Sequence, residues 1–228
     1  MSELTDKIRS RGHWDVAIRP EPFNENRVPF EELEDRVIKV AVRFRGWPVP
    51  FYDHREQPLR GEHWVGQDID AAIVSHQEAW RYFTSGQFVQ LRSVSADWRE
   101  GNEATFVPEG FAAVIEVWEI LFYLTEVFEL ATRLLLGSGG ERVTINVKLH
   151  GLENRGLVVG DSGRSSFFEP YRSTVESLEN SVSLNRDALV AGNREQAVEM
   201  ARFFLVRFGW KPATELLTDY QRELIERA

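Results

Sequence analysis

The sequence predicts an α+β fold in which a mostly antiparallel sheet packs on one long central helix, with a helical cap at the C-terminal end. The block from Phe111 to Leu136 is dominated by Leu, Val, Ile, Phe and Trp at a spacing near the 3.6-residue period of a helix. The run from Val143 to His150 then alternates with a period of 2, which is typical of a strand. A long apolar helix that leads into a sheet indicates a compact α+β domain.

The chain before this helix shows the patterns of short strands and helices separated by loops. Apolar and polar residues alternate in the predicted strands, and residues with helical spacing lie between them. Pro48 and Pro50 remove two backbone donors, so their segment belongs to an edge or a bend. The predicted strands are 14–19, 38–45, 69–75 and 87–93, the predicted helices are 29–37 and 78–83, and the predicted loops are 53–66 and 94–108.

The chain after the long helix is predicted to form further strands and then helices. Gly137 to Gly140 reads Gly-Ser-Gly-Gly, a strong signal for the end of a helix. Residues 157–159 indicate a strand, and the last third of the chain has the pattern of helices. Asn193 and Gln196 fit a capping box, and Pro212 fits the first position of the final helix.

The length indicates how these elements are organised. A chain of 228 residues buries roughly 70% of its unfolded surface, enough for one core. No internal repeat or low-complexity linker divides it. We therefore expect a flexible leader over 1–12 and a single domain over 13–228. Within that domain, 13–165 hold the sheet and the long helix, and 166–228 form the helical cap.

The composition excludes several kinds of chemistry. The chain has no cysteine, which excludes disulfides, thiolate catalysis and cysteine-ligated zinc or iron–sulfur clusters. The N-terminus lacks the apolar stretch of a secretory signal, and the long apolar segment carries four glutamates that are costly in a bilayer. We therefore expect a soluble, cytoplasmic protein with no membrane contact. The formal net charge of −9 argues against nucleic acid as a partner.

The glutamates of the long helix form two pairs, Glu116 with Glu119 and Glu126 with Glu129. At 100° per residue, Glu119, Glu126 and Arg133 lie near one another on one helix face. Paired carboxylates could hold a divalent metal or act as acid and base. No histidine accompanies them on this helix, so we interpret them as the polar stripe of an amphipathic helix. Glu129 and Arg133 then form an i,i+4 ion pair.

Arginines and aromatic side chains gather between residues 43 and 88. This combination is suited to stacking on and clamping a nucleotide or a single nucleic-acid strand. The predicted ligand-binding residues are Arg43, Arg45, Trp47, Trp64 and Trp80. Core packing is the alternative interpretation of the same aromatic side chains, since large rings dominate the cores of α+β domains.

A second candidate site lies in and just after the predicted loop 53–66. Two histidines and several carboxylates in this stretch could form a hydrolytic or metal site. The alternative acid, base or metal-binding residues are His54, His63 and Asp68. No spacing rule supports this site, so the sequence assigns no catalytic residue, no metal and no cofactor.

Four segments of the chain carry a family resemblance: Trp14–Glu21, Arg45–Pro50, Trp80–Phe88 and Leu124–Ala131. They resemble the uncharacterised region that follows the Schlafen-type AlbA domain in some bacterial DNA-binding proteins. Only a short leader precedes Trp14, so no AlbA domain is expected here and the family's nucleic-acid role does not carry over. The resemblance implies an accessory or sensing module of a bacterial defence or regulatory system.

These observations together predict a non-enzymatic sensing or protein-interaction module. We expect a protein partner, a homo-oligomer or a small-molecule ligand, with the ligand held near the arginines and tryptophans. The alternatives are a metal-dependent hydrolase or nuclease-like enzyme, and a nucleotide- or nucleic-acid-binding protein. The hydrolase alternative requires His54 and His63 to lie close together.

Overall fold

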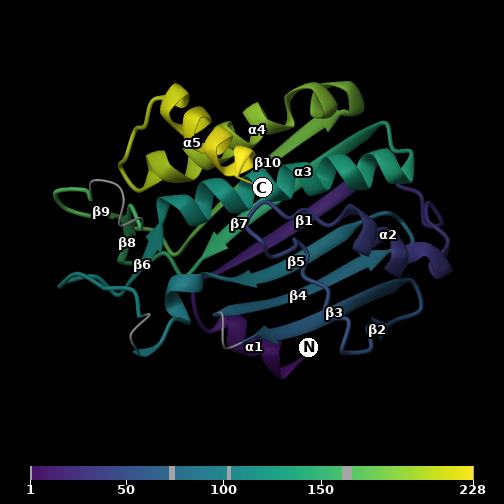
Figure 1. Cartoon of the computed structure of the whole chain (residues 1–228), viewed down its shortest axis with the longest axis horizontal. Coiled ribbons are helices and arrows are strands. Elements are labelled where there is room, and N and C mark those ends of the chain that lie inside the picture. The colour runs from purple at the N-terminus through teal and green to yellow at the C-terminus, as the bar shows by residue number, and fades with distance from the viewer. Residues whose placement is uncertain (1, 72–74, 102–103, 161–165, 228) are drawn as a thin grey trace.

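The computed structural model describes residues 2–71, 75–101, 104–160 and 166–227. The strands of its main sheet are β1 (His13–Glu21), β2 (Leu59–Arg60), β3 (Trp64–Ala71), β4 (His76–Phe83), β5 (Phe88–Ser93), β7 (Arg142–His150) and β10 (Ser177–Asn185). They are hydrogen-bonded in the order β10-β7-β1-β5-β4-β3-β2, and every neighbouring pair is antiparallel (Figure 1).

Helices pack on both faces of this sheet. They are α1 (Glu3–Arg9), α2 (Leu33–Val40), α3 (Val117–Ser138), α4 (Arg186–Arg207) and α5 (Thr214–Glu226), with the short 3-10 turns η1 (Phe30–Glu32) and η3 (Ser95–Asp97). The long helix α3 lies across one face, and α4 and α5 pack against it (Figure 1). The predicted fold class, an antiparallel sheet on a long helix with a helical C-terminal cap, is confirmed. No helix among the described residues is long and apolar enough to cross a bilayer.

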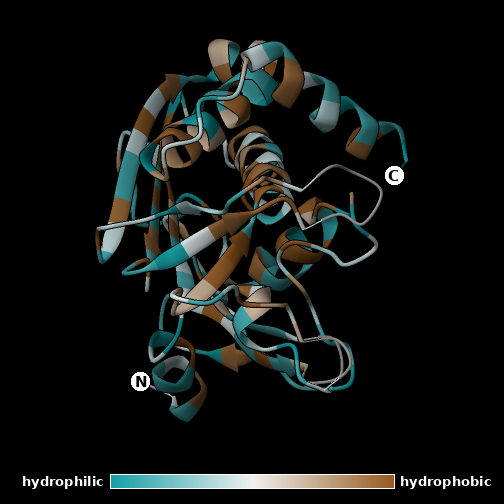
Figure 2. Cartoon of the chain, turned by 90° about the vertical axis from the view of Figure 1, so that its left-hand side faces the viewer, coloured by the Kyte–Doolittle hydropathy of each residue, from teal (hydrophilic) through white to brown (hydrophobic). Residues whose placement is uncertain are grey.

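The core forms where the sheet, α3 and α4 meet. Trp14 of β1 packs against Tyr123 of α3 and Phe204 of α4, with ring centroids 5.4 and 5.5 Å apart. All three rings are fully buried, and burial of large side chains of this kind stabilises a fold by about 1.5–3 kcal/mol each. Figure 2 shows the hydrophobic residues of α3 enclosed between the sheet and the C-terminal helices. This packing positions α3 over the centre of the sheet.

A second, three-stranded sheet lies at the start of α3. Its strands are β6 (Ala113–Glu116), β8 (Arg155–Val158) and β9 (Tyr171–Arg172). β6 runs directly into α3 and pairs in parallel with β8. Arg155 is buried, and its two terminal nitrogens each donate to the Asp97 carboxylate at 2.7 Å. The ion pair attaches the small sheet to the chain that follows β5.

The segment predicted as a flexible leader forms α1, which differs from the prediction. Ile8 is fully buried against Ala79, Leu91 and Trp98, on the sheet face opposite α3. The helix is seven residues long and buries Ile8 alone. A single buried side chain leaves no periodic pattern for sequence reasoning to detect.

Two predicted elements between β1 and β5 are wrong. The predicted helix 78–83 belongs to β4. One face of β4 packs on α1 and the other is covered by α2 and the segment 49–52, so its sequence lacks the alternation of a half-exposed strand. The predicted strand 38–45 is replaced by the end of α2, after which Val42 makes only an isolated bridge to Val49.

The long helix and the last third of the chain also differ in detail. α3 begins at Val117 rather than at 111, because β6 takes the preceding residues into the small sheet. It ends at Ser138 and is capped by Gly139, as the Gly-rich signal predicted. The last third is not wholly helical, since β10 lies within it. Its Ser and Asn residues have low strand propensity, which explains why the pattern missed it. Asn185 caps the start of α4, and Gly192 breaks the helical geometry (φ −136°, ψ 25°) directly before the predicted cap Asn193. The Asn193 side chain does not cap the helix there but donates to Glu129 Oε2 at 2.9 Å and to Thr132 Oγ1 at 3.1 Å.

Parts of several predictions fall outside the described residues. These parts are residue 1 of the leader, residues 72–74 of the predicted strand 69–75, residues 102–103 of the predicted loop 94–108, residues 161–165 at the end of the predicted sheet-and-helix part 13–165, and residue 228 at the end of the predicted cap. In the described part of the chain, the predicted strands 14–19, 87–93 and 143–150 are confirmed as β1, β5 and β7.

Candidate functional site

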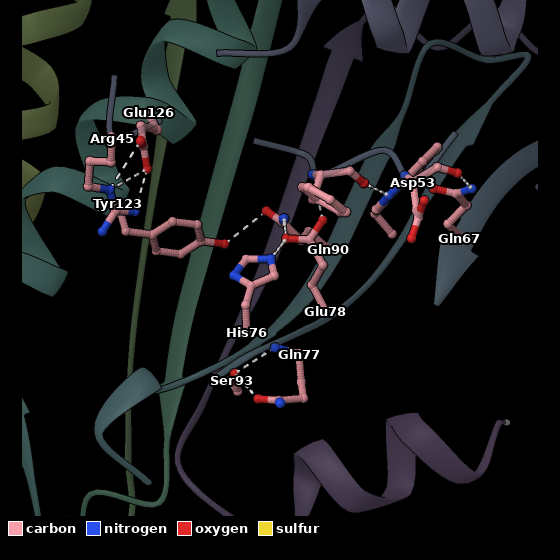
Figure 3. Close-up of polar contacts among 12 residues, drawn as sticks. Arg45, Asp53, Gln67, His76, Gln77, Glu78, Gln90, Ser93, Tyr123 and Glu126 are labelled. Carbon is pink, nitrogen blue, oxygen red and sulfur yellow. Dashed lines mark hydrogen bonds and ion pairs between the residues drawn. The ribbon is translucent and has the colours of Figure 1, made fainter. Parts of the chain in front are cut away.

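A row of polar side chains crosses the sheet face that α3 covers (Figure 3). In the register between β4 and β5, Glu78 lies opposite Arg92 and Trp80 lies opposite Gln90. Residues two apart on a strand share a face, so all four side chains point to the same side. All four are buried. Burying polar and charged groups is costly unless they have partners. Such groups are often found at functional sites, so this row is a candidate site.

The Glu78 carboxylate has no exposed surface and accepts three hydrogen bonds. Its Oε1 accepts the backbone N–H of Phe51 at 2.7 Å. Its Oε2 accepts Gln90 Nε2 at 3.0 Å and lies 2.9 Å from His76 Nε2. His76 donates to this oxygen in the tautomer that carries the hydrogen on Nε2. Tyr123 of α3 donates its hydroxyl to Gln90 Oε1 at 3.0 Å (Figure 3). Burial raises the pKa of Tyr123, which keeps this hydroxyl a donor.

Glutamates in the first half of α3 are buried, so the predicted solvent-facing stripe is wrong for them. Glu126 has no exposed surface and pairs with Arg45, whose Nε lies 3.1 Å from both carboxylate oxygens. Glu119 accepts the backbone N–H of Ser95 at 3.1 Å. Burial raises the pKa of Glu119, and the Arg92 guanidinium only partly offsets that effect.

The two outer glutamates form ion pairs. Arg133 Nε lies 2.8 Å from Glu129 Oε1, which confirms the predicted i,i+4 pair. Glu116 precedes α3 and pairs with Arg99 at 2.5 Å. Among the described residues, no three His, Asp or Glu side chains lie close enough to hold a metal ion.

A small pocket opens beside this row, between the segment 45–49 and the ends of β4 and β5. Its volume is about 150 Å³, and it is lined by Arg45, Trp47, Pro48, Val49, His76, Arg92, Ser95 and Arg99. We call it the Arg92 pocket. Trp47 is 43% exposed and stacks on the His76 ring, with centroids 6.4 Å apart. The pocket is therefore a recess with three arginines and an aromatic side chain on its wall.

Arg92 differs from the other two arginines because it forms no ion pair in the described part of the chain. Its side chain is 6% exposed, and its Nε and Nη1 are buried without a hydrogen-bond acceptor. The guanidinium lies 4.5 Å from the centroid of the Tyr123 ring. A cation–π contact contributes about 0.5–2 kcal/mol, whereas leaving a buried donor unsatisfied costs about 1–3 kcal/mol. An acceptor entering the pocket would satisfy these donors.

The structure separates the predicted ligand-binding residues. Arg45 and Trp47 line the Arg92 pocket, and Arg43 is exposed outside it. Trp80 is fully buried beneath the segment 49–52, where its ring packs in the core. Trp64 points to the opposite face of the sheet from Trp80 by the β3–β4 register. The arginines and tryptophans therefore do not form one clamp.

The alternative acid, base or metal-binding residues each have separate surroundings. His54 is exposed, and its ring packs on Tyr52 with centroids 4.8 Å apart. His63 is exposed. Asp68 pairs with Arg81 at 2.7 Å, and it lies about 16 Å along the extended chain from His63. The structure does not bring His63 and Asp68 together.

Sequence reasoning missed the residues that complete the pocket and its polar row. The signal in β5 is the alternation of Gln90 and Arg92 with Val89 and Leu91, which places both polar side chains on one strand face. Arginine is rarely buried, so a strand face that carries Gln90 and Arg92 is normally predicted to be exposed to solvent. In β4, His76, Gln77 and Glu78 are consecutive polar residues, so no alternation marks the face that carries His76 and Glu78.

No family model, no curated protein and no solved structure matches this chain. The resemblance to the region that follows the Schlafen-type AlbA domain therefore stays a prediction. The geometry of the Arg92 pocket is the basis on which a function can be assigned.

Proposed function

We propose that the protein is a non-enzymatic sensing module that binds a small oxyanion, namely a carboxylate or phosphate group, in the Arg92 pocket. The observation that supports this is a buried arginine whose Nε and Nη1 lack acceptors. An oxyanion supplies what this guanidinium lacks, through charge-assisted hydrogen bonds. Arg45 and Arg99 already pair with Glu126 and Glu116, whereas Arg92 has only an electrostatic interaction with Glu119 and forms no ion pair in the described part of the chain.

The size of the pocket limits the ligand. Sites for drug-sized molecules have volumes of roughly 300–1,000 Å³, and this pocket measures about 150 Å³. It therefore accommodates a small anion, or the acidic group of a larger molecule. The exposed face of Trp47 can stack on any part of the ligand that extends beyond the pocket.

The contacts of Arg92 support a sensing role. Its guanidinium packs on Tyr123 of α3, and the Tyr123 hydroxyl is bonded to Gln90 of β5. An anion that draws Arg92 toward the pocket alters this contact between sheet and helix. Because α4 and α5 pack on α3, the change reaches the C-terminal layer. Membership of a bacterial defence or regulatory system, which the family resemblance implies, stays a prediction.

The proposal is tested by isothermal titration calorimetry of the full chain with inorganic phosphate and with acetate, at an ionic strength held constant with chloride. We expect one of these anions to bind with a stoichiometry of one and to raise the melting temperature. A ligand at 100 times its Kd adds about 2.7 kcal/mol to the free energy of unfolding. Failure of both anions to bind the unmodified chain contradicts the proposal.

Arg92→Met removes the charge and the donors while keeping an apolar side chain of similar length against Tyr123. We expect it to lose anion binding, because the guanidinium donors and their charge are gone. Arg55→Met is the matched control: it makes the same charge change at a side chain that is 86% exposed, and its anion binding should be unchanged. Equal binding by Arg92→Met and the unmodified chain would show that the pocket is not the site.

A further inference from the structure

The strand β10 forms one edge of the main sheet. In the described part of the chain it pairs with β7 alone (Figure 1). It is nine residues long, which corresponds to about 30 Å of extended chain. An edge strand of this length presents a row of unpaired backbone donors and acceptors, which can template pairing with another strand.

The backbone hydrogen bonds show which residues face the open edge. Arg186 N–H donates to Glu141 O at 2.8 Å, and Glu176 O accepts Leu152 N–H at 2.9 Å, both on the β7 side. Backbone groups of alternate residues point to opposite edges of a strand. The N–H and C=O groups at the open edge therefore belong to the odd-numbered residues, namely Ser177, Glu179, Ser181, Ser183 and Asn185.

This edge lacks the features that usually prevent pairing. Natural edge strands carry proline, lysine, inward-pointing charges or a bulge. The sequence of β10, SLENSVSLN, has neither proline nor lysine, and its pairing with β7 is uninterrupted. Its one charge, on Glu179, is engaged by Asn146 Nδ2 at 2.9 Å and Lys148 Nζ at 3.8 Å. The Ser181 N–H at the open edge donates to Asn180 Oδ1 at 3.0 Å, and a second strand would replace this local bond with one between the two strands.

We propose that a second copy of this chain pairs with β10 in antiparallel orientation about a two-fold axis at Ser181, which makes one continuous sheet across two molecules. Each outward-facing residue then exchanges N–H···O bonds with its counterpart. Around this axis, Leu178 lies opposite Leu184 of the second copy, and Asn180 lies opposite Val182 of the second copy. The inference is independent of the Arg92 pocket, which lies away from β10.

Charge favours this register over those with the axis at Glu179 or Ser183. With the axis at Ser181, exposed Glu176 lies next to exposed Arg186 of the second copy, and symmetry makes this contact twice. An axis at Glu179 places two copies of that carboxylate opposite each other. An axis at Ser183 places Glu179 opposite Asp187 of the second copy. Opposite charges on facing strands stabilise the pair and like charges destabilise it.

Apolar surface along β10 also favours pairing with a second copy of this chain. Leu178, Val182 and Leu184 point to the helix side of the sheet, yet each is only partly buried. A two-fold axis perpendicular to the sheet keeps both helix layers on one side, so the second copy covers these side chains. It also brings its own α4 toward the groove of about 420 Å³ between β10 and α4, where Phe203 and Val206 are part of the wall.

The test is the molecular mass in solution, measured by sedimentation equilibrium over a wide range of concentration. We expect the unmodified chain to form a dimer of twice 26.3 kDa. Ser181→Pro removes an N–H that faces the open edge while leaving every bond to β7 in place, and it should be monomeric. Ser181→Thr, which keeps the N–H and favours a strand, is the matched control and should remain dimeric.

A charge exchange tests the register. Glu176→Arg and Arg186→Glu each place like charges together, so each should weaken the dimer by about tenfold or more, and the double exchange should restore it. An acidic residue at the start of α4 favours that helix, so Arg186→Glu is expected to fold. A monomeric unmodified chain would overturn the proposal. A dimer that persists in Ser181→Pro would place the interface elsewhere.

Discussion

Glu119 is a carboxyl group whose ionisation is opposed by the fold. It lies in the first turn of α3, 4% exposed, and its two oxygens lie 3.1 and 3.2 Å from the N–H of Ser95. Burial raises its pKa above the ordinary value of 4.5. Because the folded pKa exceeds the unfolded one, the proton is held more tightly in the folded state. The resulting stability is fully present below pH 4.5 and is lost as pH rises through the folded pKa.

Glu119→Gln keeps an acceptor for Ser95 and cannot ionise. At neutral pH we expect its free energy of unfolding to exceed that of the unmodified chain, by about 1.4 kcal/mol for each unit by which burial raises the pKa. Below pH 4.5 the two should converge. Urea denaturation at a series of pH values measures this. Glu153→Gln, at an exposed position, is the control and should show no such pH-dependent gain. A Glu119→Gln advantage that is constant with pH would contradict the assignment.

At the scale of the element, the end of α3 depends on one backbone conformation. Gly139 has φ 73° and ψ 18°, and its N–H bonds to Leu135 O at 3.2 Å. This left-handed conformation is strained for any residue with a Cβ. A Cβ added at Gly139 would meet nothing within 4 Å, so the cost of alanine there is conformational alone.

Gly139→Ala is expected to lower the free energy of unfolding by about 1–2 kcal/mol. Gly137→Ala is the matched control, because residue 137 lies inside the helix and an added Cβ would meet only Arg36 Nη1, at 3.8 Å. It should raise the free energy of unfolding by about 0.5–1 kcal/mol, as alanine does in a helix interior. Urea denaturation of both variants gives the signs. Effects of the same sign would show that the helix end is not set by this glycine.

At the scale of the whole molecule, one continuous core joins the elements. The main cluster of buried side chains includes Trp14 from β1, Tyr123 from α3, Leu157 from the small sheet, Phe204 from α4 and Leu217 from α5. No element of the C-terminal cap has a separate core among the described residues, where the other cluster is the small one around α1.

We therefore expect thermal unfolding to be a single cooperative transition. Far-UV circular dichroism reports the helices, and fluorescence reports the seven tryptophans distributed along the chain. The two signals should give the same midpoint, and the calorimetric and van't Hoff enthalpies should agree. Two separated transitions would instead mean that residues 166–228 unfold as an independent unit, and the single-domain prediction would then be wrong.

Part of the candidate site could be predicted from the sequence. Arg45 and Trp47 were identifiable because an arginine beside a tryptophan in a proline-bounded bend suits a binding surface. Arg92 was not, since an arginine that alternates with apolar residues has the pattern of a half-exposed strand. Its burial depends on α3, whose Tyr123 covers the guanidinium. Trp64 and Trp80 belong to one predicted set but point to opposite faces, because β4 is a strand whose register with β3 was not predicted.

Elements with a local pattern could be predicted from the sequence, because periodicity and capping act over a few neighbouring residues. They are β1, β5, β7, most of α3 and its glycine end. Which polar groups enter the core depends on contacts between segments that lie far apart in the sequence. Arg45 and Glu126 meet across 81 residues, and no local period distinguishes a carboxylate that faces water from one that faces an arginine on another segment. β10 could not be predicted for the same reason, because it is held as a strand by its pairing with β7. Its position at the edge depends on the strand order of the whole sheet.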